Sequence, residues 1–188
     1  GGDVFALVYD SKTKSVKALN GSGKSSIKTD INKLDEMGLN SIPLDGQNSG
    51  MAVSVPGCVD AWDQLLDKFG TFSLDTVLAP AVDYAQNGFG VSEITANSWK
   101  QSELKLSING ICEFLPSGSA PRFGQKVLLP QLCSTLKGIS ENGKSFFYQG
   151  IIPEKISSYV NKFRGWICEE DFKKHTCSWV EPISSNYR

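Results

Sequence analysis

The start of the chain constrains its fold more than any other feature. Residues 4–9 form an apolar run, residues 10–14 are polar, and residues 15–20 largely alternate between polar and apolar side chains. Two such runs joined by a short polar turn are typical of antiparallel strands. A run that is apolar throughout is typical of a strand buried on both faces. We therefore expect a β-hairpin whose first strand is covered on both sides.

Most of the remaining chain has the apolar spacing of helices. The stretch Asp60–Phe69 places its apolar residues on one face, and Ser73 precedes a second such stretch that ends at Asn87. A hairpin, then helices, then a returning strand indicates an α/β layered protein. The other predicted features are helices at 27–37, 92–104, 129–140, 151–163 and 169–174, a bend at Pro80, a strand at 53–55, a loop at 107–127 and an extended tail at 178–183.

The composition excludes several classes of function. The 188 residues contain 19 Lys and Arg against 20 Asp and Glu, a net charge of −1. A balance of this kind argues against binding to nucleic acid or to an anionic membrane surface. No apolar run approaches the roughly 18 residues of a membrane span. We expect neither a nucleic-acid partner nor membrane contact in this segment.

The cysteines and the histidine form no complete catalytic or metal-binding pattern. No CxxC pair occurs, which favours free, mostly buried thiols over a zinc or redox motif. The alternatives are a Cys168–Cys177 disulfide, or a metal site of these two with His175, which offers only three ligands. His175 lies in a polar stretch, so we expect it to be half-buried or at the surface. We expect no metal and no cofactor. The five cysteines are Cys58, Cys112, Cys133, Cys168 and Cys177.

Residues 18–25, ALNGSGKS, satisfy a loose phosphate-loop pattern with Ala in the place of the first Gly. Lys24 would face the phosphates and Ser25 would bind Mg²⁺. The context argues against this reading, because the preceding run belongs to a hairpin and no apolar run ending in Asp follows downstream. A nucleotide-binding domain that uses 18–25 remains an alternative at this point.

The order of several short motifs resembles the large subunit of the γ-glutamyltransferase (glutathione hydrolase) family. Each motif is weak alone, but their succession is specific and spans essentially the whole chain. The sequence GSGK at residues 21–24 resembles the hydrolase-like or acylase-like branch of this family. In chain order the motifs are GGDVFAL at 1–7, ALNGSG at 18–23, VSVPGCVDAW at 53–62, KFG at 68–70, LAPA at 78–81, NGF at 87–89, FLP at 114–116, FYQG at 147–150, EDF at 170–172, EPIS at 181–184 and YR at 187–188.

The resemblance implies a fold and a reaction. Residues 1–188 would be a single fragment of the large subunit of an N-terminal-nucleophile hydrolase, an αββα sandwich. This part would consist mostly of helices plus the N-terminal hairpin, with helices at 57–70, 74–87 and 129–163 on one face of the sheet. Such proteins cleave themselves, and the new N-terminal Thr of the small subunit attacks γ-glutamyl amides such as glutathione, with its own amine as base.

The nucleophilic Thr would lie beyond Arg188, so we expect no catalytic residue in this chain. Its partners would be the small subunit and a small γ-glutamyl substrate. The chain begins and ends inside structured-looking sequence, so we expect the native protein to be longer. Relatives are often extracellular, periplasmic or membrane-anchored, and the resemblance favours those locations. A non-catalytic scaffold of the same fold is a further alternative.

The resemblance also places substrate contacts in the turn after the second strand. Transpeptidases carry an Arg there, whose planar fork pairs with the substrate α-carboxylate. That position is Ser22 in this chain, which departs from the pattern. We expect Asn20, Ser22 and Lys24 to bind substrate, with Lys24 supplying a flexible point charge. The alternative is that Gly21 and Gly23 only close a turn and Lys24 is solvated.

Overall fold

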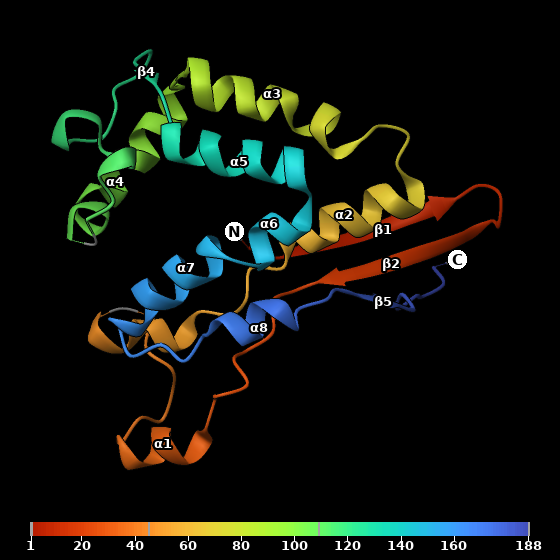
Figure 1. The fold of residues 1–188 in the computed structure, drawn as a ribbon, viewed down its shortest axis with the longest axis horizontal. Coiled ribbons are helices and arrows are strands. Elements are labelled where there is room, and N and C mark those ends of the chain that lie inside the picture. The colour runs from red at the N-terminus through yellow and green to blue at the C-terminus, as the bar shows by residue number, and fades with distance from the viewer. Residues whose placement is uncertain (1, 45, 109, 188) are drawn as a thin grey trace. The chain divides into compact units, whose positions relative to one another are not determined.

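A computed structural model describes residues 2–44, 46–108 and 110–187, without the side chain of Cys112, and it forms two compact units (Figure 1). One unit comprises residues 1–71 and 143–188, and the other comprises residues 72–142. The first unit is therefore assembled from two segments that are distant in sequence.

The predicted hairpin and the returning strand form one antiparallel sheet in the first unit. Strand β1 (Val4–Asp10) pairs with β2 (Ser15–Gly21), and β5 (Ser178–Val180) pairs with the other edge of β2. Leu19 of β2 lies opposite Trp179 of β5. The hairpin prediction is confirmed, and the extended tail provides the third strand.

Helix α2 (Cys58–Phe69) covers one face of this sheet. It lies along the hairpin in Figure 1, as its amphipathic pattern predicted. The core between helix and sheet consists of Leu19, Ala61 and Cys177, with Leu65 and Trp179 packed against them.

The opposite face of the sheet is uncovered among the described residues. Phe5, Leu7 and Tyr9 of β1 are 70%, 71% and 64% exposed, whereas Val4 and Ala6 pack toward the core on the α2 side. Successive residues of a strand point to opposite faces, so a single helix layer covers only every second side chain. The prediction that β1 is buried on both faces is wrong for this chain, because α2 supplies only one of the two covers.

Two local predictions in the first unit need correction. The helix predicted at 27–37 begins only at Ile31, because the Asp30 carboxylate accepts the Asn32 N–H at 3.0 Å and caps it. The Ile27 N–H is bonded to Asp171 Oδ1 at 2.7 Å instead. The strand predicted at 53–55 is absent, because this segment joins no ladder. The other elements are α1 (Ile31–Glu36), η1 (Gly46–Ala52), α6 (Lys144–Tyr148), α7 (Ile151–Asn161) and α8 (Glu169–Lys173).

The second unit is built from helices and a short antiparallel pair of strands, β3 and β4, which are separated in sequence by α4. Helices α3 and α5 lie side by side (Figure 1), and α3 contains Pro80 without interruption. The core of the second unit consists of Ala85, Val91, Val127, Leu129 and Cys133. No described helix is long and apolar enough to cross a membrane. The elements are α3 (Leu74–Asn87), β3 (Phe89–Gly90), α4 (Glu93–Ile108), η2 (Cys112–Phe114), η3 (Pro116–Gly118), β4 (Lys126–Val127) and α5 (Pro130–Asn142).

Phe172→Ala tests the core of the first unit. Phe172 is fully buried in α8, so its truncation is expected to lower the free energy of unfolding by about 3–5 kcal/mol. Phe123, which is 70% exposed, provides the control. Phe123→Ala is expected to change the free energy of unfolding by less than about 0.5 kcal/mol. Urea denaturation measures both. An unchanged midpoint for Phe172→Ala would contradict the packing described.

Candidate functional site

The three residues predicted to bind substrate lie in and directly after the end of β2. Asn20 Oδ1 accepts the Ser22 N–H at 3.0 Å, and Asp3 Oδ1 accepts the Gly23 N–H at 2.9 Å. Asn20 and Lys24 are exposed, and Ser22 is half-buried. We call residues 20–24 the substrate turn. Its backbone is fixed by two side chains, and the Lys24 side chain is exposed.

The segment that follows the substrate turn is anchored to the body of the first unit. The Lys24 carbonyl accepts the Val55 N–H at 3.0 Å. Ser26 Oγ donates to the Trp166 carbonyl at 2.9 Å, and the Ile27 N–H donates to the buried Asp171 carboxylate. These bonds hold the turn from its C-terminal side.

The substrate turn lies against residues 54–57 with almost no space between the two backbones. A Cβ atom on Gly57 would collide with the Gly21 carbonyl oxygen, and one on Gly23 would collide with the Val55 carbonyl oxygen. Only glycine allows backbones to approach this closely. The two segments therefore form one packed pair of turns.

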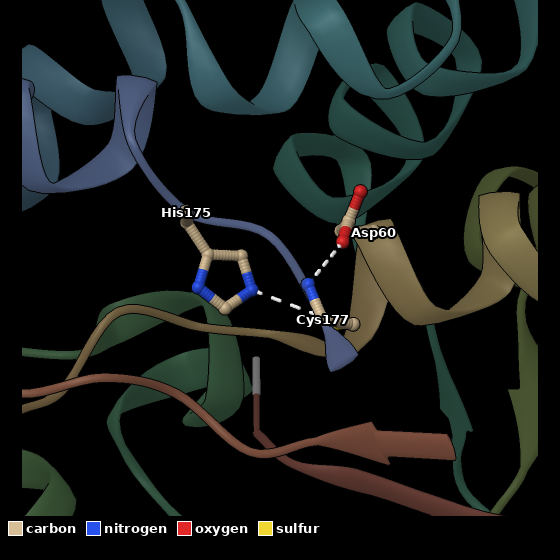
Figure 2. Close-up of side chains that lie close together, drawn as sticks. All are labelled: Asp60, His175 and Cys177. Atoms are coloured by element: carbon tan, nitrogen blue, oxygen red, sulfur yellow. Dashed lines mark hydrogen bonds between the residues drawn. The ribbon is translucent and has the colours of Figure 1, made fainter. Parts of the chain in front are cut away.

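Beneath these turns, Asp60, His175 and Cys177 gather into one group, which we call the Asp60 cluster (Figure 2). Asp60 is 2% exposed. Its Oδ2 atom accepts the Cys177 N–H at 2.6 Å and Gln64 Nε2 at 2.7 Å, and its Oδ1 atom accepts Lys144 Nζ at 2.8 Å. Burial raises the pKa of Asp60, but these donors outweigh burial and lower that pKa to about 2.

Lys144 balances the charge of the cluster. Its ammonium pairs with Asp60 and also with Asp63 Oδ2 at 2.9 Å. The hydrogen bond to Asp60 raises the pKa of Lys144 to about 12. The side chain joins α6 to α2, so the charge pair connects two segments that are far apart in sequence.

His175 lies at the boundary between buried and half-buried, close to the prediction of a half-buried residue. It is 9% exposed, its ring stacks on Tyr148 at 5.4 Å between centroids, and its Nε2 lies 3.8 Å from Cys177 Sγ. Its Nδ1 atom is buried without a hydrogen-bond partner among the described residues. Burial lowers the pKa of His175. The negative charge of Asp60 raises this pKa, and the positive charge of Lys24 lowers it. Lys173, Lys174 and Thr176 are exposed, whereas the His175 ring packs inward against Tyr148.

Tyr148 is a member of the site that sequence reasoning missed. Its hydroxyl donates to the Pro56 carbonyl at 2.7 Å and accepts the Asp60 N–H at 3.1 Å. Burial raises the pKa of this hydroxyl. The only sequence signal was its place in the 147–150 motif, which gives no indication of a contact with α2.

The Asp60 cluster contains three kinds of metal ligand. The ligand atoms of Asp60, His175 and Cys177 lie within 4.8 Å of one another, and zinc binds carboxylate, imidazole and thiolate. The donors already have other partners, however. Asp60 Oδ2 accepts two N–H groups, Lys144 neutralises its charge, and the Cys177 thiol donates to the Gly57 carbonyl at 3.4 Å. Hydrogen bonds therefore satisfy Asp60 and Cys177 as they stand, whereas His175 Nδ1 has no partner among the described residues.

The cysteines are free where the structure describes them. Cys58, Cys133 and Cys177 are buried and Cys168 is half-buried, which confirms the prediction of free, mostly buried thiols for these four. Both Cys168 and Cys177 are free, so the alternative of a Cys168–Cys177 disulfide is not formed. The Cys112 side chain lies outside the described part. Burial raises the pKa of Cys177 to about 12, which makes its thiol a poor nucleophile.

The structure contradicts a phosphate loop at residues 18–25. Strand β2 is antiparallel to both of its neighbours, and residues 22–30, all of them described, contain no helix. A phosphate loop needs a helix that begins at the Lys-Ser pair, because the helix N-terminus binds the phosphates. Lys24 and Ser25 lie in a segment without regular secondary structure instead.

Comparison with known proteins decides the family. The family model described as gamma-glutamyltranspeptidase matches residues 1–188. The chain belongs to the γ-glutamyltranspeptidase family. The resemblance drawn from the ordered motifs is thereby confirmed, although each of those motifs was weak alone.

The relatives are considerably longer than this chain. It is 40% identical over 192 residues to the glutathione hydrolase-like YwrD proenzyme of Bacillus subtilis, covering 100% of the chain and 35% of that protein. It is 31% identical over 191 residues to the glutathione hydrolase proenzyme of the same strain, covering 100% of the chain and 32% of that protein. The chain thus spans about a third of the length of these curated relatives.

Solved structures of the γ-glutamyltranspeptidase family agree with the fold over the whole chain. The cephalosporin acylase from Bacillus halodurans matches with a TM-score of 0.90 and 31% identity, covering 100% of this chain and 36% of that one. The Helicobacter pylori γ-glutamyltranspeptidase matches with a TM-score of 0.88 and 29% identity, covering 100% of this chain and 54% of that one.

Asp60→Asn tests the buried charge. The folded state lowers the pKa of Asp60 to about 2, so its contribution is present above the unfolded pKa near 4 and is lost as pH falls through 2. The variant is expected to lose about 2 kcal/mol of unfolding free energy at pH 7, and the difference should shrink toward pH 3.

The matched control is Asp67→Asn, which changes an exposed carboxylate on the same helix. It is expected to shift the unfolding free energy by less than about 0.5 kcal/mol. Urea denaturation at pH 7, 5 and 3 measures both variants. A loss for Asp60→Asn that stays constant over this range would contradict the charge-based account.

Proposed function

We propose that this chain is the large-subunit portion of a γ-glutamyl hydrolase or transferase whose nucleophilic Thr lies beyond Arg188. The observation that supports this most is the 40% identity over the whole chain to a glutathione hydrolase-like proenzyme, of which the chain covers 35%. A protein about three times as long has room for the small subunit. In this proposal residues 1–188 are one fragment of the large subunit.

The uncovered face of the sheet supports a layered sandwich. Phe5, Leu7 and Tyr9 line it on β1, and Val16 and Val180, which are 41% and 45% exposed, extend it across β2 and β5. Exposed apolar patches of this kind mark surfaces that another segment covers. We propose that a second sheet from the rest of the protein packs here and completes the αββα arrangement.

The same face leads to the substrate turn. Asn20 lies opposite Phe5 in the β1–β2 pair, so Asn20 belongs to the uncovered face and Ser22 and Lys24 follow directly. A second sheet stacked on this face would place its strand ends beside the turn. In this proposal Asn20, Ser22 and Lys24 form one wall of the substrate pocket, and the small subunit provides the opposite wall.

The reaction follows from a nucleophile that carries its own base. The Thr hydroxyl attacks the carbonyl carbon of the γ-glutamyl amide, and the Thr amine takes up the hydroxyl proton. The amine leaving group departs with a proton, and an ester-linked γ-glutamyl enzyme remains. Water then releases glutamate, or an acceptor amine takes the γ-glutamyl group. Lys24 would attract a carboxylate of the acyl donor as a point charge, in place of a bidentate Arg.

An amide hydrolase for other acyl groups is the second candidate. The cephalosporin acylase matches the whole chain with a TM-score of 0.90, and Ser22 cannot make the bidentate pair that an Arg makes with an α-carboxylate. Both candidates share the N-terminal nucleophile and differ in the acyl donor.

Expression of the complete protein tests the proposal. Intact-mass measurement is expected to show cleavage into two chains, the second beginning with Thr. Release of product from a γ-glutamyl anilide and from a glutaryl anilide then separates the two candidates, and replacing that Thr by Ala is expected to abolish both activities. A complete protein that is not cleaved would support a non-catalytic scaffold. Activity of residues 1–188 alone would overturn the proposal.

Lys24→Ala tests the role of the substrate turn. In the complete enzyme it is expected to raise KM for an acyl donor that carries a free carboxylate about fivefold, or about 1 kcal/mol, with kcat unchanged. Lys28→Ala provides the control, because Lys28 is also exposed and lies four residues later. If Lys24→Ala leaves KM for every acyl donor unchanged, the charge of Lys24 has no part in binding.

A further inference from the structure

Tyr148 connects both sides of the turn at the start of α2. Helix α2 begins at Cys58, and its N-cap residue Gly57 has no side chain to bond the first N–H groups. The Tyr148 hydroxyl, which comes from α6, accepts the Asp60 N–H at 3.1 Å and donates to the Pro56 carbonyl at 2.7 Å. One hydroxyl therefore caps the helix and holds the turn before it.

The Asp60 cluster holds this turn a second time. The Cys177 thiol donates to the Gly57 carbonyl at 3.4 Å, and the Cys177 N–H bonds Asp60 Oδ2 at 2.6 Å. The Tyr148 ring is itself fixed between two neighbours. His175 stacks on it with an interplanar angle of 22°, and Phe147 meets it edge-on with centroids 5.1 Å apart. The hydroxyl therefore has little freedom to move away from the turn.

The substrate turn packs directly against the Pro56–Gly57 turn. Gly57 touches the Gly21 carbonyl so closely that no Cβ fits between them. The Val55 N–H bonds the Lys24 carbonyl at 3.0 Å. A shift of the Pro56–Gly57 turn would therefore move Gly21 and Lys24 as well, because packed backbones have no slack to absorb it.

We propose that Tyr148 and Cys177 are positioning residues, which set the place of Lys24 in the pocket by holding the Pro56–Gly57 turn from below. Neither side chain belongs to the substrate turn, and both are buried. The inference rests on the proposed function, because it assumes that the substrate turn binds the acyl donor. Since the turn contacts the donor before and during reaction, its displacement weakens binding of both states and raises KM more than it lowers kcat.

Tyr148→Phe in the complete two-subunit enzyme tests the proposal. The variant keeps the ring and its stacking on His175 but removes the hydroxyl. KM for an acyl donor with a free carboxylate is expected to rise about fivefold, with kcat within about twofold of the parent. Tyr84→Phe is the control, because Tyr84 is 60% exposed on α3, and it is expected to change neither constant.

A double variant separates positioning from a general structural effect. If Tyr148 acts through Lys24, then Tyr148→Phe in a Lys24→Ala background is expected to raise KM by less than about twofold further. Fully multiplicative effects of the two substitutions would overturn the positioning role while leaving the proposed function intact. No effect of Lys24→Ala alone would overturn the proposed role of the turn and the inference with it.

Cys177 provides a second route if Tyr148→Phe fails to fold. Cys177→Ala removes the donor to the Gly57 carbonyl and is expected to raise KM about threefold, whereas Cys177→Ser keeps a donor and is expected to restore KM to within about twofold of the parent. Equal KM values for the alanine and serine variants would overturn the role of this bond.

Discussion

The first unit depends on one buried carboxylate and the groups that satisfy it. Asp60 is almost fully buried, and a charge in that position is tolerated only with partners that compensate for the lost water. Lys144 from α6, the Cys177 backbone from the segment before β5 and Gln64 from α2 itself provide them. Packing of α2 on the sheet therefore requires that α6, the segment before β5 and α2 itself all donate to this one carboxylate. The substrate turn lies directly on the helix start that these bonds fix.

Much of the fold could be predicted from local pattern. The hairpin at 4–20 and the helices near 60–69 and 73–87 follow from spacing and end signals that neighbouring residues carry themselves. The predictions failed where a distant partner decided the outcome. The helix predicted at 27–37 begins only at Ile31, because Asp30 caps it there and the residues before it are held by Trp166 and Asp171, which lie 140 and 144 positions away from Ser26 and Ile27. No local pattern in the sequence contains that competition.

In the candidate site, too, features set by neighbouring residues could be predicted and features set by distant partners could not. The substrate turn was located by the resemblance of residues 18–23 to a family motif, and the structure places Asn20, Ser22 and Lys24 together because they are neighbours in sequence. The Asp60 cluster could not be predicted, because Asp60 lies more than a hundred positions before His175 and Cys177, and His175 is flanked by polar residues. Burial of a single side chain in a polar stretch depends on which neighbour it stacks on, here Tyr148.

The insertion of the second unit into the first has a consequence for the order of folding. Residues 72–142 form a unit of their own, so its contacts are complete as soon as that stretch is synthesised. Asp60, in contrast, leaves the ribosome 84 residues before Lys144 and 117 residues before Cys177. Closing such long loops is slow relative to local helix formation. We therefore expect the inserted unit to complete its contacts before the buried contacts of Asp60 form.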